Sequence, residues 1–141
     1  MKLLKRLSIL FLSFILFSAF TLFETPDYVG KWRGEDKGDI GYVTFTKDGY
    51  AIFEFDGQIM GGKSFVRDGV EASMQYEVNK KEGFYNVDFI VKDLATGKTK
   101  GKLLGIFKMT SDTEMVLAIG FDESSRPTNF ETNQIILRKI D

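Results

Sequence analysis

Apolar and polar residues alternate with a period of two through most of the chain from Tyr28 onward. The alternation is clearest over residues 70–78, where every second residue from Val70 to Val78 is apolar and the residues between are polar. Successive side chains of a strand point to opposite faces, so this pattern predicts a half-buried strand. Residues 84–93 repeat it. Further strands are expected at residues 29–35, 40–46, 50–56, 63–67, 100–109, 113–121 and 133–140, with no convincing helix among them.

Turn residues separate these strands at intervals of about eight to fourteen residues. They are Lys37-Gly38-Asp39, Asp48-Gly49, Asp56-Gly57, Gly61-Gly62, Asp68-Gly69, Lys81-Glu82-Gly83, Thr96-Gly97-Lys98 and Thr110-Ser111-Asp112. Asp48-Gly49 and Asp68-Gly69 are typical of tight hairpins, because Asp-Gly can adopt the positive φ angles that two-residue loops need. Gly61-Gly62 is expected at a turn or a bulge, and Gly105 at a bend or a close backbone approach.

An all-β fold follows, because no helix is available for a parallel crossover. The predicted architecture is an antiparallel up-and-down meander of eight to nine strands over residues 28–141. Closure into a barrel would hide the strand edges. A two-sheet sandwich is the alternative, and periodicity does not separate the two.

The N-terminal segment has the layout of a secretory signal peptide. Lys2, Lys5 and Arg6 precede an apolar run from Leu7 to Phe17, and small residues follow at Ser18 and Ala19. We expect residues 1–21 to be the signal. An uncleaved anchor extending to Phe23 is the alternative. Either form predicts an extracytoplasmic domain, periplasmic or secreted, or anchored to the membrane by this segment.

Composition and charge narrow the function further. The chain has no cysteine, so disulfides and lipid attachment through cysteine are excluded. The three basic residues of the N-terminal segment leave 16 Lys and Arg against 20 Asp and Glu, a net charge near −4. That balance argues against nucleic acid as a partner. The sequence does not indicate an oligomeric state.

The start of the first strand, Gly30-Lys31-Trp32, resembles the GxW signature that opens the first strand of lipocalins. In that family the Trp closes the narrow end of the barrel, and an Arg of the last strand packs across the indole. The resemblance implies that Gly30 and Trp32 close this barrel. Arg138, in the last expected strand, is the first candidate to cover Trp32, and Arg126 is the second.

The C-terminal half is similar to short bacterial extracytoplasmic lipocalin-like domains. The matching segments are Gly105-Ile106-Phe107, Asp112-Thr113-Glu114-Met115, Arg126-Pro127-Thr128-Asn129-Phe130 and Ile136-Leu137-Arg138-Lys139. Phe107 stands where that family tends to have Tyr. This likeness implies a fold more than an activity.

Enzymatic chemistry has little to draw on. The chain has neither His nor Cys, so a His-based triad, a thiolate nucleophile and a Cys/His zinc site are excluded. Glu54 and Asp56 are expected to be a solvated strand face rather than a catalytic pair. Gln58 to Gly62 is not followed by a helix, so a phosphate cradle is not expected. No catalytic residue, metal ion or cofactor is predicted.

Arg126 has two interpretations. Pro127 holds it extended, so its guanidinium is presented from a fixed backbone. As a structural cap, Arg126 would pair with Asp122, Glu123 or nearby carbonyls while Phe130 plugs the barrel end. As an anion hook, it would grip a carboxylate at the cavity mouth. We favour the cap.

Two functions fit these features. The first is a binding module that holds a small apolar or amphipathic molecule inside the barrel. Its candidate lining residues are Tyr50, Ile52, Met74, Tyr76, Tyr85, Val87, Phe89 and Phe107. The second is a structural or protein-interaction domain of the cell envelope whose barrel is filled by its own side chains. A barrel of about eight strands is just wide enough for either.

Overall fold

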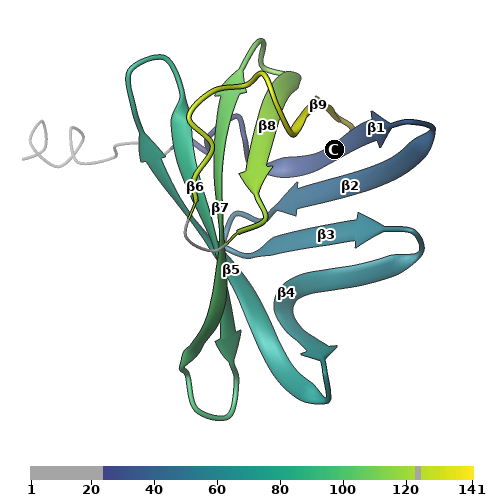
Figure 1. The fold of residues 1–141 in the computed structure, drawn as a ribbon, viewed down its shortest axis with the longest axis vertical. Coiled ribbons are helices and arrows are strands. Elements are labelled where there is room, and N and C mark those ends of the chain that lie inside the picture. Colours follow the sequence, from purple (N-terminus) through teal and green to yellow (C-terminus); the bar gives the residue numbers. More distant parts are fainter. Residues whose placement is uncertain (1–23, 123–124) are drawn as a thin grey trace, which may run out of the picture.

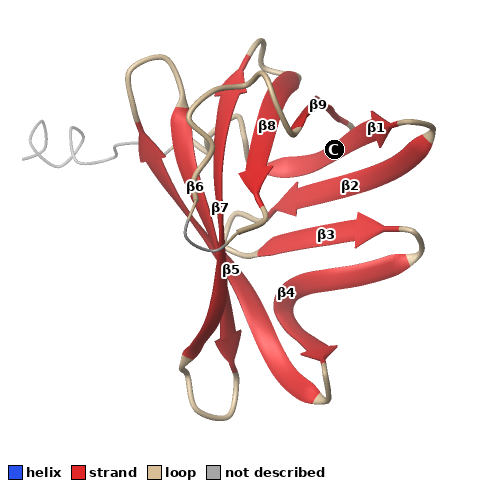
Figure 2. Cartoon of the chain, viewed as in Figure 1, coloured by secondary structure: helices blue, strands red, loops and turns tan. Residues whose placement is uncertain are grey.

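The computed structural model describes residues 24–122 and 125–141. The predicted signal segment, residues 1–21, lies outside the described residues. The described part of the chain is built from strands, turns and loops and contains no helix (Figure 2). Accordingly, these residues include no helix that is long and apolar enough to cross a membrane.

Nine antiparallel strands form one closed barrel, in the order in which they occur along the chain (Figure 1). They are β1 (Gly30–Asp36), β2 (Asp39–Phe45), β3 (Ala51–Phe55), β4 (Gln58–Arg67), β5 (Val70–Lys80), β6 (Tyr85–Asp93), β7 (Thr99–Met109), β8 (Glu114–Gly120) and β9 (Gln134–Lys139). The barrel closes where β9 pairs with β1, with Trp32 opposite Lys139. The predicted all-β meander and its closure into a barrel are therefore confirmed, and the sandwich is excluded.

The tight hairpins follow from residues that tolerate positive φ. At the β4–β5 turn, Asp68 and Gly69 have φ angles of 50° and 76°, which confirms the predicted two-residue hairpin. At Asp48-Gly49 a hairpin also forms, but only Gly49 has positive φ, at 93°. That loop is longer, and the Thr46 hydroxyl accepts a 2.8 Å hydrogen bond from the Tyr50 amide. The Asp48-Gly49 pair thus marks a hairpin of a different type.

Gly61 and Gly62 lie inside β4 rather than at a turn between strands. The residues before Gly62 pair with β3 and those after it pair with β5, and the register shifts between Gly62 and Phe65. A bulge that bends the strand explains this change of partner. Gly61 has φ of 114° and approaches the Ala51 carbonyl so closely that a Cβ would collide with it. The prediction of a bulge is correct here, and the prediction of a turn is wrong.

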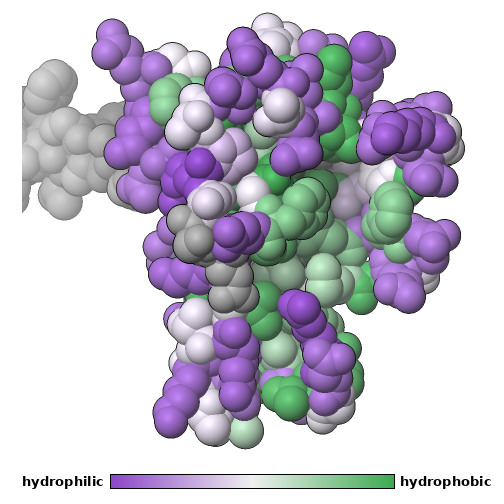
Figure 3. All heavy atoms as spheres, in the orientation of Figure 1, coloured by the Kyte–Doolittle hydropathy of each residue, from purple (hydrophilic) through white to green (hydrophobic). Residues whose placement is uncertain are grey.

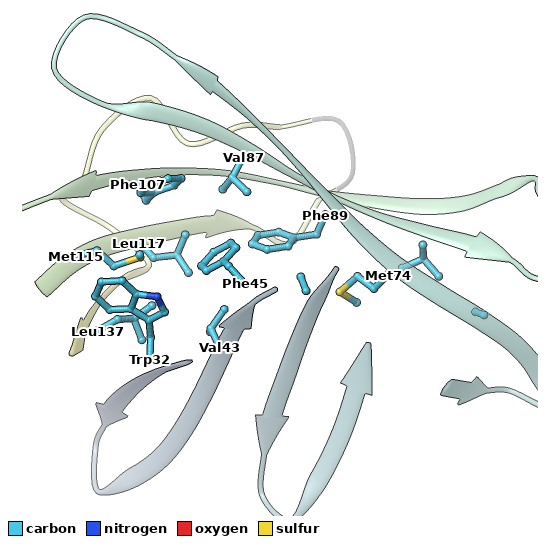
Figure 4. Packing of buried hydrophobic residues seen from close by; sticks show 13 residues of the cluster. Trp32, Val43, Phe45, Met74, Val87, Phe89, Phe107, Met115, Leu117 and Leu137 are labelled. Atoms are coloured by element: carbon cyan, nitrogen blue, oxygen red, sulfur yellow. The ribbon is translucent and has the colours of Figure 1, made fainter. Parts of the chain in front are cut away.

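Inward side chains from all nine strands except β4 meet in one buried core (Figure 4). Its members are Trp32, Val43, Phe45, Ala51, Ala72, Met74, Val87, Phe89, Val91, Phe107, Met115, Leu117 and Leu137. Strand β4 adds Met60 and Phe65 as partly buried neighbours. Burying an aliphatic or aromatic side chain of this kind contributes about 1.5–3 kcal/mol.

A second apolar layer lies on the outside of the barrel. Ile106, Val116 and Ala118 alternate with core residues along β7 and β8, so they point outward, and yet they are buried. The loop from β8 to β9 lies against this part of the wall, where Arg126 bonds to the Gly105 carbonyl and the Phe130 ring contacts Lys108 (Figure 1). Both faces of β8 are therefore covered, which explains why its apolar run from Met115 to Ala118 does not alternate with polar residues.

Candidate functional site

Six of the eight residues predicted to line a ligand cavity fill the barrel interior instead, and the aromatic ones among them gather toward one end, which we call the filled end. Met74, Val87, Phe89 and Phe107 have no exposed surface at all. Tyr76 and Tyr85 are partly buried and pack against this core. The rings of Tyr85 and Phe107 stack with their centroids 4.8 Å apart. These six residues therefore belong to the packed interior and do not line an empty cavity, because they are buried by packing against one another.

Tyr50 and Ile52 do not belong to the interior, so their assignment as lining is wrong. They alternate with Ala51 and Phe53, which face the core. Because a strand has a side-chain period of two, Ile52 must then point outward. The ring of Tyr50 lies 5.8 Å from the ammonium of the exposed Lys63.

Tyr28 closes this filled end of the barrel. Its ring makes edge contacts with four aromatic residues, with centroid separations from 5.5 to 6.4 Å. The four are Phe45, Tyr76, Tyr85 and Phe107. Burial, together with the nearby Tyr85, raises the pKa of the Tyr28 hydroxyl. Tyr28 precedes β1 and so has no place in the alternation of a strand. The sequence indicates its role only by placing an aromatic residue just before Gly30-Lys31-Trp32.

Trp32 is fully buried and is fixed by a polar contact as well. Its indole Nε1 donates a 2.9 Å hydrogen bond to the Tyr28 carbonyl. The cation over the indole is Lys139, whose Nζ lies 5.6 Å from the ring centroid. Arg138 points outward and faces Glu114 at 3.6 Å, so the assignment of Arg138 to the indole is wrong. Leu137 and Trp32 face the core, and the period of two then places Lys139, not Arg138, on the Trp32 side.

Gly30 also belongs to this junction between β1 and β9. A Cβ at Gly30 would lie 2.7 Å from the Lys139 Cε and 2.5 Å from the Asp141 carbonyl oxygen, and the φ of Gly30 is 143°. The absence of a side chain is therefore what lets the C-terminal backbone pass close to the start of β1. This placement agrees with the expected role of Gly30 in closing the barrel.

Arg126 is a structural clamp on the outer wall. Its guanidinium donates to the carbonyls of Val87 and Gly105, at 3.3 and 2.9 Å, and to the Asp88 carboxylate at 2.6 Å. The favoured cap interpretation is correct as to the carbonyls, and Asp88 of β6 supplies a carboxylate that the interpretation did not include. Glu123, the other loop candidate, lies outside the described residues. The Asp88 carboxylate already neutralises the guanidinium at 2.6 Å, which favours the cap over the anion hook.

Phe130 and Pro127 lie on the same side of the wall as this clamp. The Lys108 Nζ sits 4.8 Å from the Phe130 ring, and Lys108 points outward between the core-facing Phe107 and Met109. Phe130 therefore covers the outer face, and the prediction that it plugs the barrel end is wrong. Pro127 packs near Gly120, where the loop leaves β8.

Gly105 approaches the backbone of the neighbouring strand β8 closely, as the sequence predicts. A Cβ at Gly105 would lie 2.9 Å from the Ala118 carbonyl oxygen.

A cavity of about 290 Å³ lies at the opposite, open end of the barrel. We call it the open-end cavity. Its lining residues are Arg67, Asp68, Val70, Ala72, Val91, Lys100 and Gly101. They come from the β4–β5 and β6–β7 hairpins, which project at the lower end of Figure 1. Apolar surface shows between these two hairpins in Figure 3.

The strand register shows that this cavity is a continuation of the barrel interior. Residues paired across an antiparallel ladder share a face. Arg67 pairs with Val70, and Val91 pairs with both Met74 and Gly101. Ala72 and Val91 are members of the buried core and also line the cavity. The cavity therefore opens directly onto the core, and Met74 lies beneath it.

Two smaller hollows lie near the tips of the β1–β2 and β3–β4 hairpins. They have volumes of about 210 and 280 Å³ and share Ile40, Phe55 and Asp56. Phe55 is 58% exposed, although it lies on the inward face of β3. Their charged lining residues, Asp39, Glu54 and Asp56, are all acidic, and Glu54 is paired with Lys31 at 2.8 Å.

The two carboxylates that the sequence singles out, Glu54 and Asp56, have structural contacts or positions. Glu54 is held by Lys31, and Asp56 belongs to the β3–β4 turn, with a φ of 51°. Across residues 24–122 and 125–141, no three acidic side chains converge as ligands for a metal ion would. Among the described residues, the open-end cavity is a hollow whose floor belongs to the buried core, and sequence reasoning missed it. The alternation in residues 70–78 marks its inner face, but the sequence does not show which end of the barrel stays open.

Comparison with known proteins adds no relative. No family model matches the chain, and no curated protein or solved structure matches it. The likeness of Gly30-Lys31-Trp32 and of Arg126 to Phe130 to lipocalin segments therefore stays a prediction, and the fold rests on the strand pairing described above.

Proposed function

We propose that this chain is an exported binding barrel that holds one small apolar or amphipathic molecule in the open-end cavity. The observation that carries the proposal is a cavity of about 290 Å³ whose floor is part of the hydrophobic core. Ligand pockets of proteins begin at about 300 Å³ and combine an apolar lining with a few polar groups. The open-end cavity meets this description at its lower limit, so a small ligand is expected.

The binding site differs in place from the one expected inside the barrel. The aromatic residues at the filled end leave no exposed surface on Phe89 or Phe107, so a ligand there would have to displace the core. At the open end, Val70 is still 40% exposed, and a ligand could cover it without moving the core. Apolar surface covered in this way contributes about 25 cal/mol per Å².

The export part of the proposal rests on the N-terminal segment. Lys2, Lys5 and Arg6 followed by an apolar run are the features that export machinery reads. A fusion of residues 1–30 to a reporter that is active only outside the cytoplasm should give an active reporter. An inactive reporter on an intact cytosolic fusion protein would contradict export.

Val70→Trp tests the binding part. The indole would occupy the cavity from a position that is already partly exposed, so the fold should be retained. Isothermal titration of decanol should show binding to the natural chain and at least tenfold weaker binding to Val70→Trp. Val66→Trp is the matched control, because Val66 is 72% exposed and does not line the cavity.

The second candidate is a structural or protein-interaction domain of the envelope that has no small ligand. The fully packed filled end favours it, because Trp32, Phe45, Phe89 and Phe107 already occupy that part of the interior. Failure of decanol to bind the natural chain, together with no small molecule in mass spectra of protein purified from its native compartment, would favour this candidate.

A further inference from the structure

We infer that the ligand of the open-end cavity carries an acidic group, which Arg67 and Lys100 bind at the rim while its apolar part lies on Val70, Ala72 and Val91. This inference rests on the proposed function and specifies its ligand class. The class is a small amphipathic acid, such as a medium-chain monocarboxylate.

The cavity has a polar rim and an apolar floor. Arg67 is next to the β4–β5 turn and Lys100 is near the start of β7, so the two cations stand on the two projecting hairpins. Their side chains are 60% and 56% exposed. Ala72 and Val91, by contrast, are 3% and 7% exposed and form the floor. A ligand with one charged end and one apolar end matches this division.

The charges at the rim are weakly neutralised by the protein. Arg67 lies 3.9 Å from Asp68, and Lys100 lies 3.9 Å from Asp93. By contrast, Arg126 lies 2.6 Å from Asp88, and Lys31 lies 2.8 Å from Glu54. Hydrogen bonds between an ammonium or guanidinium and a carboxylate are about 2.7–2.9 Å long, so the pairs at the rim are loose contacts.

The carboxylates near the rim have other roles. Asp93 Oδ1 accepts hydrogen bonds from the Ala95 and Thr96 amides, at 2.8 and 3.2 Å, and thereby fixes the β6–β7 turn. The side chain of Asp68 is 93% exposed, in the two-residue turn. An incoming carboxylate can therefore approach Arg67 or Lys100 without breaking a close ion pair.

The depth of the cavity limits the apolar part of the ligand. Met74 and Phe89 pack below Ala72 and Val91, and neither has exposed surface. The chain of the ligand ends at these two residues unless the core rearranges. A small acid is expected for this reason, and not a long-chain lipid.

The experiment compares decanoate, decanol and decylammonium by isothermal titration. Decanoate should bind about tenfold or more tightly than decanol, because a charge-assisted hydrogen bond adds that much, and decylammonium should bind most weakly. Raising NaCl from about 0.05 to 0.5 M should weaken decanoate binding and leave decanol binding unchanged, because exposed charges are screened.

The double variant Arg67→Gln/Lys100→Gln should lose the preference for decanoate and keep decanol binding. The double variant Lys102→Gln/Arg138→Gln is its matched control. It removes one Lys and one Arg that are exposed on the outer face, and it should behave like the natural chain. Trp32 emission shows whether each variant is folded.

The outcomes separate this inference from the proposed function. Equal binding of decanoate and decanol, unchanged by Arg67→Gln/Lys100→Gln but lost in Val70→Trp, would overturn the acidic ligand and keep the binding barrel. Binding of none of the three compounds would overturn both. Cosedimentation with phosphatidylglycerol vesicles, without binding of free decanoate, would overturn the small acid in favour of a lipid headgroup.

Discussion

The guanidinium of Arg126 donates a 2.6 Å hydrogen bond to the carboxylate of Asp88, which joins the loop before the last strand to the outer wall of the barrel. The same guanidinium reaches the carbonyls of Val87 and Gly105, which face each other across the β6–β7 ladder. One side chain thus connects three segments that are far apart in the sequence. These contacts fix the loop that leads into β9, the strand that closes the barrel against β1.

Replacing Arg126 should destabilise the fold by an amount that its hydrogen bonds explain. Arg126→Ala leaves a partly buried carboxylate and two carbonyls without this donor, so the free energy of unfolding should fall by about 1–3 kcal/mol. Arg126→Lys should recover little of this loss, because an ammonium cannot match the planar guanidinium. Urea denaturation of the three proteins measures the difference.

Arg138→Ala is the matched control for Arg126→Ala. The Arg138 side chain is 75% exposed and its partner Glu114 is 3.6 Å away, so its loss should change the free energy of unfolding by less than about 1 kcal/mol. Equal losses for the two arginines would contradict the clamp.

Trp32 should report the packing of the filled end. The indole is fully buried and its Nε1 is bonded to the Tyr28 carbonyl, so the emission of the native protein should be blue-shifted relative to the unfolded chain. Trp32→Ala should cost about 3–5 kcal/mol, as truncation of a core aromatic does. An emission maximum near that of tryptophan in water would contradict the buried position. Trp32 is the single tryptophan of the chain, so the signal is unambiguous.

The strands could be predicted from the sequence because their signals are local. Residues 70–78 alternate without interruption, and Asp68-Gly69 can adopt the positive φ that the turn needs. The need to protect strand edges in a meander without helices favours a barrel, but the sequence pattern leaves the two-sheet sandwich open. Such local patterns predict the structure correctly because each depends on only a few neighbouring residues.

The wrong predictions concern the cation over Trp32 and the place of the cavity, and both depend on how the whole barrel is assembled. Whether Arg138 or Lys139 lies over Trp32 depends on which residues of β9 face inward where β9 pairs with β1. A shift of one residue in this pairing would turn every side chain of β9 to the opposite face. The period of two shows that Phe89 faces inward, but not whether space remains beside it. Tyr28 fills that space from outside any strand, and the cavity remains at the other end.

The bulge in β4 should be sensitive to any side chain at Gly61. Its φ of 114° is rarely adopted by other residues, and a Cβ would collide with the Ala51 carbonyl. Gly61→Ala should therefore lower the free energy of unfolding by about 2–4 kcal/mol, a backbone strain together with a clash. Chemical denaturation measures this loss.

Gly97→Ala is the control, because Gly97 has a φ of 70° but open space around it. Only about 1–2 kcal/mol of the free energy of unfolding should be lost there. Equal losses would mean that β4 tolerates the clash.

Tyr76 should make the fold less stable at high pH. Its hydroxyl donates a 2.7 Å hydrogen bond to the Thr46 carbonyl, and burial, with smaller contributions from Tyr28 and Asp48, raises its pKa to about 12. In the unfolded chain a tyrosine ionises near pH 10, so between about pH 10 and 12 the unfolded state binds fewer protons than the folded state. The stability that Tyr76 contributes is then fully present below about pH 10 and is lost as the pH rises through about 12.

Tyr76→Phe should be less stable at neutral pH, because the Thr46 carbonyl loses its donor, but its stability should fall less steeply in alkali. Urea denaturation at several pH values, with tyrosinate absorbance followed in parallel, measures both effects. Parallel pH profiles for Tyr76→Phe and the natural chain would show that the alkaline loss comes from other groups, with Tyr28, whose pKa is also raised, as the next to replace.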